Sequence, residues 1–175
     1  MALRRIAIAR KSSSQIISEK NMALRQEFWP DITENMLWHR KRKIGFTTVP
    51  RTMSYIFEIM DSLSPGKPVS SAYFVLWCHT FDEYMVTIAN PRAMALESGF
   101  RGERAESTWN GRMKILCDLG FIKAKSGASG LYNYVLIMNP YTIIRELKEG
   151  RKTIPLDTYN AFFERTTQIG ATDMD

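Results

Sequence analysis

Apolar residues recur every three to four positions along most of the chain, which is the spacing of an amphipathic helix. The pattern predicts helices over residues 13–28, 52–63, 69–81, 91–98, 103–118, 141–148 and 157–166. Ser70 and Ser71 are candidate N-caps of the third helix, Pro91 suits the first position of the fourth, and Gly120 closes the fifth. We expect a basic tail over the first dozen residues and a frayed acidic end after the last helix.

Three shorter segments alternate between apolar and polar positions, which is typical of strands. They are EYMVTIAN (residues 83–90), FIKAK (121–125) and LYNYVLIM (131–138). The stretch SGASG between the last two supplies glycines for a five-residue hairpin loop. The pattern therefore predicts a mainly α protein with a small antiparallel β-sheet.

The helix predicted over residues 103–118 has an unusual polar side. Ala105, Met113 and Leu116 fall within about 40° of Trp109 on a helical wheel and form its apolar side. The opposite side carries short or polar residues: Arg104, Ser107, Asn110, Gly111 and Lys114. Glycine inside a helix costs about 1 kcal/mol relative to alanine, and close approach of another molecule is one reason to tolerate it.

From Ser70 to Met138 the predicted elements follow the order helix, strand, helix, turn, helix and hairpin. RAMALESGF and RAESTWNGRMKILCDLGFI supply the two helices around the turn, and IKAKSGASGLYNYVLI supplies the hairpin. This order, with LxxLGFI before a glycine-containing hairpin, resembles the winged helix-turn-helix family, which includes regulators and the replication initiators of plasmids and phages. The resemblance implies a winged-helix domain over residues 52–150, a basic N-terminal extension over 1–51, and a C-terminal helix and tail over 151–175.

The same resemblance implies that the second helix enters the DNA major groove, while the hairpin, or wing, reaches the neighbouring backbone or minor groove. The implied groove-facing residues are Arg104, Ser107, Asn110, Gly111 and Lys114. Asn110 would read adenine, and Arg104 would read guanine or hold a phosphate. The implied contacts of the wing and of the helix start are Lys123, Lys125, Ser126, Ser129 and Arg101.

These roles have ordinary structural alternatives. Lys123 and Lys125 alternate with apolar residues, as they would on any solvent-exposed strand. Glu103 and Glu106 suit the start of a helix but would repel phosphate. The residues alone therefore leave both interpretations open.

The formal net charge of +6, with a pI near 9.4, is unevenly distributed. Net charges of +7, −3, +3 and −1 fall on residues 1–52, 53–91, 92–133 and 134–175. Two basic segments around an acidic one indicate a polyanionic partner, more often nucleic acid than an anionic membrane.

The strongest basic run lies beside Trp38 and consists of Arg40, Lys41, Arg42 and Lys43. It fits a solvated loop, an arm in the DNA minor groove, or a nuclear-type basic patch. The residues of this run leave nucleic-acid contact and simple solvation both open.

Catalytic and metal-binding motifs are missing from the sequence. It contains no Walker loop, HExxH or Gly-x-Ser-x-Gly motif, and its two histidines and two cysteines lack zinc-site spacing. Cys78 and Cys117 lie in apolar helical patterns, so we expect reduced, core-facing thiols, and we expect Trp77 and Trp109 in the core as well. No enzyme activity, cofactor, metal or small-molecule substrate is predicted, and no apolar run is long enough to span a membrane.

The sequence thus favours a non-enzymatic, sequence-specific binder of double-stranded DNA in the cytoplasm, associated with the nucleoid. Its role would be transcription regulation, or replication or maintenance of a mobile element. A homodimer would read a two-fold site, and the helix over residues 13–28 is either its dimer element or packs within the chain. The alternatives are a winged-helix protein-interaction module in a larger assembly and an RNA-binding module.

Overall fold

The computed structural model describes residues 12–42, 44–150 and 153–171, and the basic tail, Lys43 and the acidic end lie outside them. Contacts between Cα atoms divide the chain after Phe46 into a smaller N-terminal unit and a larger unit over Thr47–Asp175. Each unit is described by itself.

The N-terminal unit contains helix α1 (Ser13–Phe28) and two 3-10 turns, η1 (Glu34–Met36) and η2 (Arg40–Arg42). A capping box begins α1: the Gln15 amide donates to Ser12 Oγ (3.3 Å), and the Ser12 amide donates to Gln15 Oε1 (2.8 Å). The helix ends before Pro30, as the sequence predicts. Its apolar residues, among them Ile17, Leu24 and Phe28, are exposed.

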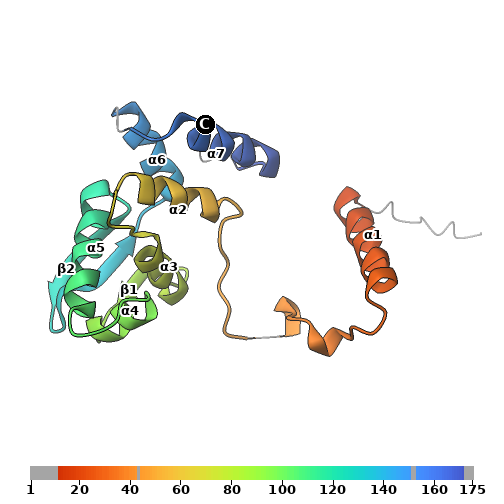
Figure 1. Ribbon diagram of the computed structural model, residues 1–175, viewed down its shortest axis with the longest axis horizontal. Coiled ribbons are helices and arrows are strands. Elements are labelled where there is room, and N and C mark those ends of the chain that lie inside the picture. The colour runs from red at the N-terminus through yellow and green to blue at the C-terminus, as the bar shows by residue number, and fades with distance from the viewer. Residues whose placement is uncertain (1–11, 43, 151–152, 172–175) are drawn as a thin grey trace, which may run out of the picture. The chain divides into compact units, whose positions relative to one another are not determined.

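The larger unit is mainly helical with a small antiparallel sheet, which confirms the predicted fold class, and its arrangement is winged-helix-like (Figure 1). Its elements are α2 (Met53–Ser62), α3 (Ser70–His79), β1 (Met85–Thr87), α4 (Pro91–Glu97), α5 (Ala105–Leu119), β2 (Ile122–Gly127), β3 (Gly130–Ile137), α6 (Pro140–Glu149) and α7 (Leu156–Ile169). The sheet order is β1-β3-β2, with both pairs antiparallel. The hairpin strand β3 therefore lies in the centre of the sheet.

A single hydrophobic core joins the helices to the inner face of the sheet. Ile56 of α2, Leu76 of α3, Trp109 and Leu116 of α5, and Val135 of β3 are fully buried within it. Burying a large apolar side chain contributes about 1.5–3 kcal/mol, so this shared core fixes α5 relative to the hairpin. Trp109 lies in the core as predicted, whereas Trp77 is only half-buried.

The C-terminal helix α7 packs against α2 and is longer than the 157–166 expected from the sequence (Figure 1). Thr158 Oγ1 donates to Glu58 Oε1 (2.9 Å). The rings of Tyr141 and Phe162 stack with 5.7 Å between centroids. The Tyr141 and Thr52 hydroxyls are 2.6 Å apart and both buried. Helices α6 and α7 thus close the side of the unit away from the hairpin turn.

Two expectations about α3 are wrong. Its N-terminus is capped by neither serine side chain, because Asp61 Oδ1 accepts from the Val69 and Ser70 amides (2.7 and 2.9 Å). Cys78 is exposed rather than core-facing, and Cys117 is half-buried. Apolar residues lie all around this helix, so its sequence does not indicate which side is buried. Cys78 lies one turn after the exposed Phe74 and is therefore on the exposed side.

Candidate nucleic-acid interface

Helices α4 and α5 are joined by a short turn whose backbone is held by a helix cap, two glycines and Arg101. Asn90 Oδ1 caps α4 by accepting from the Ala93 amide (3.0 Å), and Pro91 occupies the first helical position as predicted. Gly99 and Gly102 have φ of 92° and 78°, which favour glycine. Arg101 folds back and donates to the Leu96 and Phe100 carbonyls, so its guanidinium stabilises the end of α4.

Helix α5 presents the polar side that the sequence predicts. Arg104, Ser107, Gly111 and Lys114 are exposed and Asn110 is half-buried. They follow at three- to four-residue spacing and form one stripe along the helix. The helix ends at Gly120, whose φ of 89° supports a left-handed C-cap.

Gly111 has no packing role in the free protein. A Cβ built on it meets no heavy atom within 4 Å, and its backbone is helical. The cost of this glycine is therefore not offset by contacts in the described residues. Its effect is to leave the middle of the exposed stripe flat.

Lys114 forms an exposed ion pair with Asp118, one turn further along α5. Its Nζ lies 2.6 Å from Asp118 Oδ2, and this hydrogen bond raises the pKa of Lys114. The carboxylate partly neutralises the C-terminal end of the stripe. An anion bound there has to compete with Asp118 for the lysine.

The wing turns more tightly than the sequence suggests. Gly127 pairs with Gly130, so Ala128 and Ser129 alone form the turn, and a register shift falls between Lys125 and Gly127. The expected five-residue loop is therefore wrong. The strands extend closer to the tip because Gly130, with φ of 124°, adopts a backbone that other residues rarely allow.

Asn133 anchors the wing turn to the loop after β1. Its Nδ2 donates to the Ile88 carbonyl (3.0 Å), which also accepts from Ser129 Oγ. Gly127 must lack a side chain, because a Cβ there would lie 2.0 Å from Asn133 Oδ1. Ser129 is thus engaged within the fold, while Lys123, Lys125 and Ser126 are exposed.

Asn133 and Arg112 are two residues beside the candidate interface that sequence reasoning missed. A lone asparagine at an inward position of an alternating strand was the available signal for Asn133. Arg112, on α5, lies with its guanidinium carbon 5.7 Å from the ring centroid of Phe100. Its Nε is buried without a hydrogen-bond partner among the described residues, and nothing in the sequence distinguishes this arginine from an exposed one.

The basic run in the N-terminal unit forms the 3-10 turn η2, with Arg40 and Arg42 exposed. The backbone of Lys41 belongs to the same turn, and Lys43 lies outside the described residues. The ring of Trp38 packs edge-on against Phe46, with 6.1 Å between centroids.

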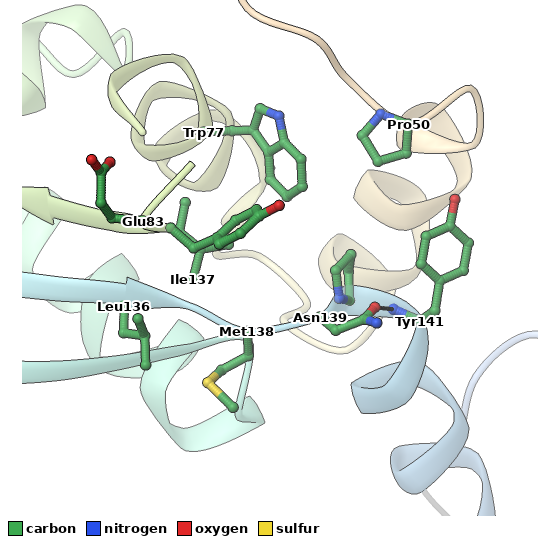
Figure 2. Close-up of a pocket in the computed structure, with 10 residues that line it drawn as sticks. Pro50, Trp77, Glu83, Leu136, Ile137, Met138, Asn139 and Tyr141 are labelled. Atoms are coloured by element: carbon green, nitrogen blue, oxygen red, sulfur yellow. Dashed lines mark hydrogen bonds between the residues drawn. The ribbon is translucent and has the colours of Figure 1, made fainter. Parts of the chain in front are cut away.

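A separate cavity of about 470 Å³ lies between α3, the end of β3 and the start of α6 (Figure 2). Trp77, Pro50 and Tyr141 border it, and the Trp77 indole donates to the Thr48 carbonyl (2.9 Å). Glu83 is its charged residue, and its carboxylate points away from Pro50 and Tyr141. A mostly apolar lining is typical of pockets that bind small molecules.

Among the residues described, no cluster of His, Cys, Asp or Glu could hold a metal ion. His79 is bound to Glu97 (Nε2 to Oε2, 2.7 Å). No helix in the described part of the chain is long and apolar enough to cross a membrane. Comparisons with models of protein families, with curated proteins and with solved structures gave no match.

Proposed function

We propose that this protein is a winged-helix, sequence-specific binder of double-stranded DNA that acts without catalysis. The observation that carries the proposal is the polar stripe on α5, which is flat at Gly111 and lies beside a hairpin with exposed lysines. A major groove about 12 Å wide admits such a helix. The biological role would be transcription regulation, or replication or maintenance of a mobile element, in the cytoplasm.

In this proposal Asn110 and Arg104 read base edges, while Ser107 and Lys114 complete the groove-facing stripe. Lys123, Lys125 and Ser126 contact the DNA backbone, which adds affinity independent of sequence. Arg40 to Lys43 contribute further salt-dependent affinity, and a homodimer reads two half-sites. Ser129 and Arg101 act by holding the wing turn and the inter-helix turn, since their side chains bond within the fold.

The test is a fluorescence-anisotropy titration against the DNA upstream of the protein's own coding sequence and against random duplex, each at two salt concentrations. We expect tighter binding to the upstream duplex, with affinity falling steeply as salt rises. Asn110→Ala should reduce the preference by about 1–3 kcal/mol, whereas Lys125→Ala should weaken all duplexes alike and lower the salt slope by about one. Lys67→Ala, in the exposed loop after α2, is the matched control.

Two results would overturn the proposal. One is the absence of duplex binding at low salt, which would favour the protein-interaction module. The other is unchanged affinity and preference in both interface variants while their folds remain intact.

A further inference from the structure

The outer face of the sheet carries apolar side chains, beside the two wing lysines, that the proposed duplex recognition does not use. Strand pairing places two cross-strand rows there, Met85–Leu136–Lys123 and Thr87–Tyr134–Lys125. Met85, Tyr134 and Leu136 have between 42% and 49% of their surface exposed, although large apolar side chains in strands usually pack. A hollow of about 690 Å³ on this face is lined by every residue of the two rows except Thr87.

The face is chemically graded across its three strands. Edge strand β2 carries Lys123 and Lys125, and the central strand β3 carries Tyr134 and Leu136. Asp82 and Glu83 come just before the other edge strand, β1, in the sequence. No acidic side chain of the described residues lines the hollow. The lysines of β2 therefore lie beside apolar and aromatic side chains, and no described acidic residue lining the hollow neutralises their charge.

This distribution of charged and apolar side chains favours one kind of ligand for the face over another. A second copy of the chain packed on this face would bring no acidic side chain of the hollow to these lysines, because none of the described residues that line it is acidic. A single nucleic-acid strand has the complementary chemistry: flat apolar bases on one side and phosphates on the other. Lys123 and Lys125, two residues apart on one strand, are separated by about 7 Å, close to the distance between successive phosphates of an extended strand.

We propose that this face binds single-stranded DNA, with bases against Tyr134 and Leu136 and phosphates at Lys123 and Lys125. The choice of DNA over RNA rests on the proposed function, because the same hairpin would lie beside duplex DNA and would meet a strand opened there. The stacking geometry itself does not depend on duplex recognition.

The experiment is an anisotropy titration of full-length protein with labelled 12-nucleotide oligo-dT, which cannot pair with itself. Tyr134→Ala should weaken oligo-dT binding about tenfold, because stacking on an aromatic ring is lost. Tyr134→Phe should retain nearly all of it, since the ring remains. Asn110→Ala should leave oligo-dT affinity unchanged, and Tyr134→Ala should leave duplex affinity unchanged, so the two proposals fail independently.

An unlabelled abasic 12-mer of equal charge separates stacking from charge. It should compete at least tenfold less well than oligo-dT. The proposal is overturned if the abasic strand competes equally, if oligo-dT does not bind at low salt, or if Tyr134→Ala binds like the wild type. Tenfold tighter binding of oligo-U than of oligo-dT would assign the face to RNA instead.

Discussion

Gly111→Ala should raise the stability of this protein and lower its affinity for DNA. Gly111 lies in the middle of α5 with helical backbone, is exposed, and leaves open space around a built Cβ. Alanine therefore gains the full difference in helix propensity, about 0.8–1 kcal/mol, without a clash. For a folded unit of this size, the melting temperature should rise by about 3 °C.

The same methyl group should weaken binding to duplex DNA. If α5 lies in the major groove with Gly111 towards the bases, a Cβ fills the space that the glycine keeps open. Overpacking in a close contact costs about 1–3 kcal/mol, so affinity should fall about tenfold. The stability gain and the affinity loss have opposite signs, which no general unfolding effect produces.

Urea unfolding and anisotropy titration against duplex DNA, on the same preparations, measure both quantities. Asn160→Ala is the matched control, because Asn160 is exposed within α7 and its replacement also raises helix propensity. It should be more stable and bind DNA normally. Unchanged DNA affinity of Gly111→Ala would refute the placement of this side of α5 in the groove.

Three further changes test other parts of the structure. Asp118→Asn releases Lys114 from its ion pair, so duplex affinity measured by anisotropy should rise about two- to threefold at low salt, and by less in a Lys114→Ala background. Tyr73→Phe removes a buried hydroxyl without a hydrogen-bond partner among the described residues, so urea unfolding at pH 7 should show a gain of about 1 kcal/mol. Burial raises the pKa of Tyr73, so the unfolded chain ionises first and wild-type stability falls as pH rises above about 10, a loss that should be smaller in the phenylalanine variant. Gly127→Ala places a Cβ against Asn133 and should destabilise the larger unit by about 1–3 kcal/mol in urea, with a smaller effect when Asn133 is already alanine.

Helices α4 and α5, on either side of the turn over residues 99–102, were predictable because their local sequence signals agree with the tertiary fold. The periodicity of α5 reports one buried side, and Trp109 and Met113 both lie on it. Pro91 and Gly120 begin and end their helices for backbone reasons that need no distant partner. The polar stripe of α5 follows from the same periodicity, so its exposure was also predictable.

The sheet face was not predictable, because it depends on register. A five-residue loop over residues 126–130 would pair Lys125 with Leu131 and place Val135 on the lysine face. The observed two-residue turn, together with the register shift between Lys125 and Gly127, pairs Lys125 with Tyr134 instead. A change of one residue in register exchanges the two faces of a strand, so alternation alone could not show which residues accompany the lysines.

The exposed stripe of α1 bears on whether protomers pair. Ile17, Leu24 and Phe28 follow at i, i+7 and i+11, which places them within about 40° of one another on the helix. A helix of 16 residues is marginal in water on its own, so burial of this stripe must supply much of its stability. If the partner is α1 of a second protomer, helix formation and dimerisation are one equilibrium. Leu24→Asp should then lower far-UV helicity and the dimer fraction in sedimentation together, and reduce affinity for a two-half-site duplex while sparing a single half-site. Loss of helicity without any change in sedimentation would show that the stripe packs within one chain.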